Sequence, residues 1–133
     1  MGNGDGMGIS ACLITKNEED ALARSLEMIS AYVDEIVVVD GQSEDKTVEV
    51  AEKFGAVVIR RRFSGSFAIE RNSGIERAEN EWVFILDPDE TLEPELLRML
   101  WDLTSSKKYD AYSFLRYDVL PDGTVLETPC GHP

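Results

Sequence analysis

Short apolar segments alternate with amphipathic segments of about 10–13 residues over most of this chain. The apolar segments are rich in β-branched residues and have the length of buried strands, whereas the amphipathic segments place apolar side chains on one helical face. This alternation is typical of βαβ units, in which helices cover both faces of a parallel sheet. The predicted strands are 9–14, 35–39, 56–59 and 82–86, and the predicted helices are 18–30, 44–54, 66–78 and 93–103.

Glycines mark the end of one predicted helix and weaken another. Gly55 follows the second helix directly, as a C-terminal stop does, whereas Gly74 lies inside the third helix and lowers its propensity. After residue 105 the pattern changes to two β-like segments, 109–117 and 124–128, joined by a turn at 120–123. We therefore expect an α/β fold with a mostly parallel sheet that ends in a short antiparallel β segment.

Carboxylates follow the last strand of the predicted parallel sheet without a break. The apolar run at 82–86 stops at Asp87, and Asp89 and Glu90 come immediately after it. Open α/β sheets bind ligands at the carboxyl ends of their strands. Two carboxylates on such a loop suit a magnesium- or manganese-type ion that completes its shell with substrate phosphates and water, so the pattern predicts a metal-bound diphosphate. The alternative is that the acids form a turn and help to start the helix signalled at 91–95.

A second acid ends the second predicted strand. Asp40 is followed by Gly41 and, two residues later, by Ser43. This order places Asp40 in the same carboxyl-edge crevice as Asp87, where its carboxylate can accept hydrogen bonds from a nucleobase N–H or a ribose hydroxyl. The alternative is that Asp40 and Gly41 form a turn and that Ser43 is the N-cap of the second helix.

The segment after the first strand excludes one large class of nucleotide-binding proteins. A dinucleotide-binding unit has the pattern G-x-G-x-x-G there, so that the backbone can approach a pyrophosphate. This chain has Thr15, Lys16, Asn17, Glu18 and Glu19 instead. These side chains are too large and too acidic for a binding loop of the NAD type.

The 133-residue chain carries a formal net charge of −13. This acidity argues against non-specific nucleic-acid binding, which needs a basic surface. A polyanionic ligand would have to be met by a metal or by individual arginines. Arg71 and the run at 60–62 are the candidates, although three arginines that leave a strand are also typical of a solvated face that balances nearby acids.

No segment of the chain has the length and apolarity of a transmembrane helix or a signal peptide. Residues 1–8 have neither a basic region nor an apolar core, so we expect a flexible leader there, a single domain over 9–133 and a cytoplasmic protein. Cys12, Cys130 and the single histidine, His132, make neither a disulfide framework nor a His/Cys zinc motif.

Taken together, the motifs resemble those of the GT-A glycosyltransferases of family 2. The resemblance covers roughly residues 9–103 in colinear order and is most similar to the branch that includes lipopolysaccharide-core β-glucosyltransferases. It implies a Rossmann-like GT-A domain that binds a nucleotide-sugar. The segments that carry it are 14–19, 34–47, 71–72 and 81–90.

The resemblance implies roles for individual residues. Asp89, together with Asp87, matches the D-x-D pair that holds Mn²⁺ or Mg²⁺, and Glu90 continues the D-x-D-E pattern of that branch. Pro88 departs from the smaller residue that is usual between the two acids, yet its fixed φ suits a turn. The residues that match nucleotide-sugar-binding positions are Thr15, Asn17, Glu18, Asp40, Arg71 and Asp87.

The implied activity is inverting, metal-dependent transfer of a sugar to an acceptor hydroxyl. The donor is a nucleotide-diphosphate sugar, with a UDP-sugar favoured. The acceptor is a glycan or a lipid-linked molecule, as in cell-envelope polysaccharide or lipopolysaccharide synthesis. Peripheral contact with a membrane is a further hypothesis. The general base of the family lies in the acceptor-binding half, downstream of the matched region. We therefore expect the base to lie outside this chain, and the positions of Asp118 and Asp122 recommend neither of them for that role.

Two other functions stay open at this point. A catalytically incomplete nucleotide-sugar-binding or assembly module would bind the same donor without transfer. A nucleotidyltransferase would also use acid-bound metal on an α/β sheet, but the missing Gly-rich, basic loop after the first strand argues against it. An unpaired edge of a shortened sheet favours a homodimer. Phe63 and Phe67 are hypothesised to belong to a loop that covers the donor.

Overall fold

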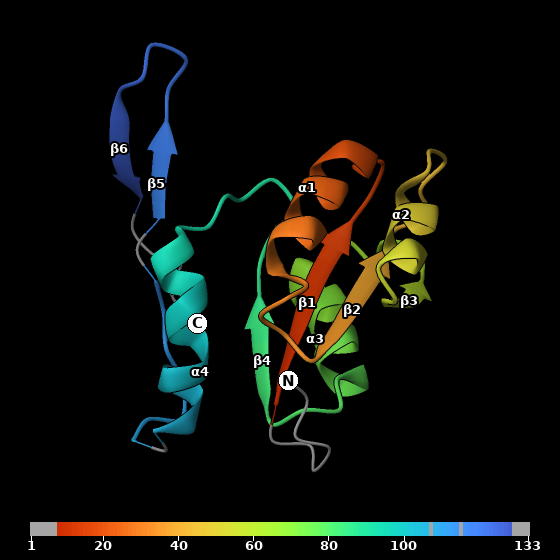
Figure 1. The fold of residues 1–133 in the computed structure, drawn as a ribbon. Helices are drawn as coiled ribbons and strands as arrows, with labels where there is room; N and C mark the ends of the chain where they lie inside the picture. Colours follow the sequence, from red (N-terminus) through yellow and green to blue (C-terminus); the bar gives the residue numbers. More distant parts are fainter. Residues whose placement is uncertain (1–7, 107, 115, 129–133) are drawn as a thin grey trace.

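A four-stranded parallel sheet forms the centre of the computed structural model, which describes residues 8–106, 108–114 and 116–128 (Figure 1). The strand order is β3-β2-β1-β4, so β1 lies between β2 and β4. All three pairings are parallel, which confirms the predicted parallel sheet. The strands are β1 (Ile9–Thr15), β2 (Glu35–Asp40), β3 (Val57–Arg60) and β4 (Trp82–Ile85).

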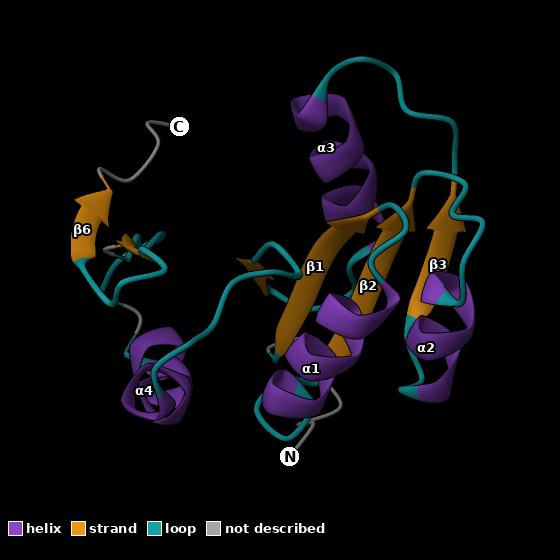
Figure 2. Ribbon diagram, turned by 90° about the horizontal axis from the view of Figure 1, so that it is seen from above, coloured by secondary structure: helices purple, strands orange, loops and turns teal. Residues whose placement is uncertain are grey.

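Helices cover both faces of this sheet, as predicted. Figure 2 shows α1 and α2 on one face and α3 on the opposite face. The fourth helix and the segment after it lie on the β4 side of the sheet (Figures 1 and 2). The helices are α1 (Glu19–Ile29), α2 (Thr47–Lys53), α3 (Phe67–Arg77) and α4 (Pro94–Ser105).

The central strands are buried on both faces, which explains why they read as nearly continuous apolar runs. On the α1 side, Leu13 and Val38 pack with Leu22 and Leu26, and all four side chains are fully buried. Burial of a side chain of this size stabilises the fold by about 1.5–3 kcal/mol. The hydrophobic core therefore fixes the positions of β1 and β2 more firmly than those of the partly exposed edge strands β3 and β4.

Gly74 lies in the middle of α3 because the helix approaches β1 closely at this point. A Cβ atom at position 74 would lie 2.2 Å from Cys12 Sγ and 3.1 Å from Val39 Cγ2. A glycine costs a helix about 1 kcal/mol relative to alanine. Because glycine has no side chain, α3 can pack directly on β1 and β2 at this point.

In the parallel-sheet region, the boundary that differs most from the sequence-based prediction is the start of the second helix. The second helix begins at Thr47 rather than at residue 44, and Lys46 is its N-cap. The prediction that Ser43 caps this helix is wrong, because the Ser43 hydroxyl donates to Asp40 Oδ1 instead, at 2.6 Å. A buried carboxylate is a stronger acceptor than the alternatives open to a serine at a helix start.

The predicted strand 109–117 is much shorter in the structure. Residues 109–114 form no strand; Tyr112 stacks on Trp82 at 5.6 Å between ring centroids, and Phe114 meets Phe84 edge-on at 6.4 Å. These aromatic side chains pack against β4. The strands β5 (Arg116–Val119) and β6 (Val125–Thr128) then pair as an antiparallel ribbon.

The expected leader falls almost wholly outside the described residues, as do Cys130 and His132. Gly8, the last residue of that leader, accepts a hydrogen bond from the backbone N–H of Trp82 at 3.3 Å. Within the described ranges, no helix combines the length and apolarity needed to cross a bilayer.

Candidate functional site

The strand order reverses between β1 and β4. The chain builds β1, β2 and β3 in one direction and then returns to pair β4 with the other side of β1. Ligands of open α/β sheets bind where the strand order reverses in this way. The loop that carries Glu18 and the loop that carries Asp87 and Asp89 border this point.

Asp40 is held inside the protein at the end of β2. Its side chain is fully buried, and it accepts hydrogen bonds from the Thr15 hydroxyl (3.1 Å), the Ser43 hydroxyl (2.6 Å) and the Ser43 backbone N–H (2.8 Å). Arg60 Nε lies 3.6 Å from the second carboxylate oxygen. The carboxylate that was predicted to contact the nucleotide therefore joins the carboxyl ends of β1 and β3 to the loop after β2.

Asn17 joins the loops after β1 and β2 by a different geometry. It has a left-handed backbone, with φ of 50°, which asparagine tolerates better than most residues. Its side-chain oxygen accepts from the backbone N–H of Glu44 at 2.7 Å, and its own N–H donates to the Ser43 hydroxyl at 2.8 Å. The structure thus shows Asn17 as a clamp between loops, and its contact with a nucleotide stays a prediction.

The acids after β4 form a tight turn whose carboxylates face outward. The Glu90 backbone N–H donates to the Asp87 carbonyl at 3.0 Å, and Glu90 Oε1 accepts from the Asp87 N–H at 2.7 Å. Pro88 is buried, whereas Asp87 and Asp89 are exposed. Neither of these two carboxylates forms a hydrogen bond or ion pair with another residue that the structure describes. The turn predicted as an alternative is present, and it presents the D-x-D acids to solvent.

The pKa of Glu18, in the loop after β1, is affected by the acids after β4. Burial raises the pKa of Glu18, a hydrogen bond from the Lys16 backbone N–H partly offsets this, and the negative charges of Asp89 and Asp87 raise the pKa further. These carboxylates are therefore close enough to repel one another.

The donor set suits a metal that is only partly held by protein. Within the described part of the chain, no group of three or more His, Cys, Asp or Glu side chains is arranged to hold a metal ion. Magnesium-type ions commonly take one or two carboxylates and complete their shell with substrate phosphates and water. The uncommitted, hard oxygens of Asp87 and Asp89 fit that mode of binding, and a cage made of protein alone does not occur here.

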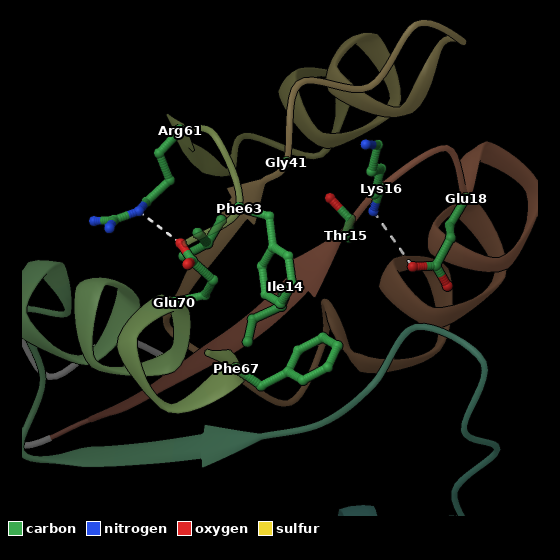
Figure 3. A pocket seen from close by; sticks show the side chains of 10 residues that line it. Ile14, Thr15, Lys16, Glu18, Gly41, Arg61, Phe63, Phe67 and Glu70 are labelled. Atoms are coloured by element: carbon green, nitrogen blue, oxygen red, sulfur yellow. Dashed lines mark hydrogen bonds and ion pairs between the residues drawn. The ribbon is translucent and has the colours of Figure 1, made fainter. Parts of the chain in front are cut away.

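A pocket of about 300 Å³ opens at the carboxyl ends of β1 and β2 (Figure 3). It includes Thr15 and Glu18, two of the predicted nucleotide-sugar-binding residues, whereas Asp40 and Arg71 are not part of its lining. Arg71 lies on α3, where its charge lowers the pKa of Cys12, although burial dominates and raises that pKa to about 11. The remaining lining residues are Ile14, Lys16, Val39, Gly41, Arg61, Phe63, Phe67 and Glu70.

Sequence reasoning missed Glu70 in this pocket, whereas Arg61 was already a candidate for meeting a polyanionic ligand. Glu70 is only 2% exposed, and Arg61 Nε forms an ion pair with Glu70 Oε1 at 2.6 Å. Of the two roles predicted for the arginine run at 60–62, the balancing of nearby acids is consistent with this pair. Arg60 and Arg61 make separate ion pairs with acids of the protein itself, one with Asp40 and one with Glu70.

Comparisons with known proteins identify the family of this chain. A model of glycosyl transferase family 2 matches residues 10–128. An uncharacterized glycosyltransferase of Rickettsia conorii is 36% identical over 104 residues, which make up 78% of this chain and 36% of that protein. A TPR repeat-containing protein of Synechococcus elongatus is 32% identical over 81% of this chain and 27% of its own length. This chain thus spans about a third of the length of the curated relatives that it matches.

Solved structures show the same fold. Mannosyl-3-phosphoglycerate synthase from Rubrobacter xylanophilus superposes with a TM-score of 0.63 at 25% identity, over 77% of this chain and 37% of that one. Glucosyl-3-phosphoglycerate synthase from Mycobacterium tuberculosis, solved with Mn²⁺ and UDP, gives a TM-score of 0.58 at 25% identity, over 77% of this chain and 41% of that one. The parallel sheet and these matches together show that the chain has a GT-A-type fold and belongs to glycosyl transferase family 2.

Proposed function

We propose that this chain is the donor-binding part of an inverting, metal-dependent glycosyltransferase that uses a nucleoside-diphosphate sugar, with a UDP-sugar favoured. One observation carries the proposal. The exposed carboxylates of Asp87 and Asp89 lie at the reversal of strand order, close enough to Glu18 to raise its pKa. The solved relative with Mn²⁺ and UDP supports this choice of ligand.

The proposed reaction breaks the bond between the anomeric carbon and the diphosphate oxygen. An acceptor hydroxyl forms the new bond from the opposite face of the sugar, and its proton passes to a general base, which is proposed to lie in the acceptor-binding part of the whole protein. The leaving diphosphate takes the electron pair of the broken bond. A divalent ion, Mn²⁺ or Mg²⁺, would supply Lewis-acid stabilisation of that charge.

The residues of this chain have distinct tasks in that reaction. Asp89 and Asp87 would hold the ion and the phosphates that it carries, and Glu18 would line the passage from these acids to the pocket. Asp40 and Asn17 would keep the loops after β1 and β2 in place, because their hydrogen bonds are already made within the protein. We propose a glycan or lipid-linked acceptor of the cell envelope, as for the branch that the sequence resembles.

Calorimetric titration of the chain with UDP tests the proposal, with and without Mn²⁺, on the wild type and on Asp89→Asn. We expect Mn²⁺-dependent binding that Asp89→Asn weakens by at least about tenfold, a loss of about 1.4 kcal/mol. Asp102→Asn, an exposed acid on α4, is the matched control and should bind as the wild type does. Equal binding by wild type and Asp89→Asn would contradict the metal role of Asp89.

A further inference from the structure

Two exposed aromatic rings form one wall of the pocket. Phe63 and Phe67 are 43% and 64% exposed, and their ring centroids lie 5.0 Å apart with an interplanar angle of 45°. Both residues line the pocket, and Figure 3 shows their rings beside Ile14, with Thr15 on the other side of the space. Large apolar rings that stay exposed in a concave site commonly mark a binding surface.

A buried carboxylate fixes the loop that carries Phe63. Glu70 Oε2 accepts hydrogen bonds from both the backbone N–H and the hydroxyl of Ser64, the residue after Phe63, and the N–H bond measures 2.9 Å. Glu70 Oε1 pairs with Arg61, and Arg61 also donates to the Ser73 hydroxyl at 3.1 Å. A buried charge is costly unless it is paired and hydrogen-bonded, so this network ties residues 61–64 to the first turn of α3.

We propose that Phe63 and Phe67 form an aromatic wall on which the nucleobase of a nucleoside diphosphate stacks, and that Arg61, Ser64 and Glu70 are positioning residues that hold this wall. This inference rests on the proposed function and adds the surface that receives the base. Every base has a flat π-face that can stack on an aromatic side chain. Neither ring is needed to fill the core, since both remain exposed.

The position of the pocket supports binding of the base at the aromatic wall and of the phosphates at Asp89. Glu18 lines the pocket in the loop after β1, and β1 pairs in parallel with β4, so the pocket and the acids that follow β4 lie at the same carboxyl edge of the sheet. A nucleoside diphosphate with its phosphates at Asp89 would therefore have its base near the pocket. The aromatic wall is the apolar, flat surface that this base would meet there.

The first test replaces Phe63 with leucine, which keeps an apolar side chain and removes the π-face. Binding of UDP, GDP, CDP, ADP and dTDP in the presence of Mn²⁺ is measured by calorimetry, and the tightest nucleotide is then used. We expect Phe63→Leu to weaken it by about 5- to 150-fold, the range measured for loss of one base–aromatic stack. Tyr109→Leu removes an exposed ring of another aromatic pair, outside this pocket, and should leave binding unchanged.

The second test asks whether Glu70 acts by holding the wall. Phe63→Trp introduces an indole whose fluorescence we expect to be quenched when a base stacks on it. Combining it with Glu70→Gln should reduce this quenching at saturating nucleotide, which a loss of stability alone would not do in a folded protein. Ser64→Ala removes the exposed end of the same network and serves if Glu70→Gln does not fold; we expect the same change, but smaller.

The outcomes separate this inference from the proposed function. Unchanged affinity in Phe63→Leu, together with weakened binding in Asp89→Asn, would overturn the aromatic wall and leave the donor site intact. Full quenching in both the Glu70→Gln and Ser64→Ala backgrounds would overturn the positioning role. Failure of the wild type to bind any of the five nucleotides would overturn both proposals.

Discussion

Two acidic strand ends in this molecule look alike in the sequence and differ in the structure. Asp40 ends β2 fully buried, with protein donors on both of its oxygens. Asp87 follows β4 and, with Asp89, is exposed and uncommitted toward the described residues. The difference teaches that an acid at the carboxyl edge of a sheet can have one of two roles. A buried, hydrogen-bonded acid holds the surrounding loops in place, whereas an exposed acid is available to bind a ligand.

The largest expected effect is a difference in stability between variants of the buried acid and of the exposed acid. Asp40→Ala should lower the free energy of unfolding by about 3 kcal/mol, because it leaves the buried donors of Thr15 and Ser43 without their acceptor. Asp89→Ala should change it by less than about 0.5 kcal/mol, as is usual for an exposed position. Urea unfolding of both variants measures the contrast. A smaller loss for Asp40→Ala than for Asp89→Ala would contradict it.

A second prediction concerns the buried contact between α3 and β1 at Gly74. Gly74→Ala should destabilise the protein by about 2 kcal/mol, because the new Cβ would overlap Cys12 Sγ. Part of this cost should disappear in a Cys12→Ala background, where the sulfur atom is gone. A double-mutant cycle followed by thermal unfolding measures that coupling. Purely additive effects would show that α3 does not press on β1 at this point.

The smallest predicted effect concerns Glu18, whose pKa is raised mainly by burial and further by the charges of nearby acids. The folded chain holds the Glu18 proton more tightly than the unfolded chain does, so stability falls as pH rises from the ordinary glutamate pKa to the raised one, and stays lower above it. Glu18→Gln should therefore stabilise the metal-free protein at neutral pH by a few tenths of a kcal/mol, since Glu18 is partly solvated. This gain should shrink as pH is lowered.

The Asp89→Asn background tests the cause of that effect. Removing the charge of Asp89 removes part of the repulsion, so Glu18→Gln should gain less stability there than in the wild type. Urea unfolding at neutral pH in the absence of divalent ions compares the four proteins. An equal gain in both backgrounds would mean that Asp89 and Glu18 do not interact.

Local sequence pattern was sufficient to predict the parallel sheet and the residues at its carboxyl edge. The apolar runs and the helical periodicity depend on neighbours in the chain, and Thr15, Glu18 and Asp87 follow directly from where strands end. The four strands and four helices of the βαβ region are all present, with boundaries shifted by up to three residues.

The errors arose where contacts between distant segments decide the outcome. Ser43 had the signature of a helix cap, but the buried carboxylate of Asp40 binds its hydroxyl. Residues 109–114 had a β-like pattern, but Tyr112 and Phe114 pack on the rings of β4. Glu70 looked like any surface acid of a helix, and only the folded chain brings it to Arg61.

The central claim is that the acids after β4, and not the buried Asp40 at the end of β2, hold the metal of a nucleotide-bound state. NMR of the chain with UDP and low concentrations of paramagnetic Mn²⁺ tests it directly, because the ion broadens the amide signals nearest to it. We predict selective broadening at Asp87, Asp89 and Glu18, abolished by Asp89→Asn. Equal broadening at Glu49 and Glu52, the acids on the exposed side of α2, would show that Mn²⁺ binds the acidic surface without selection and would contradict the account.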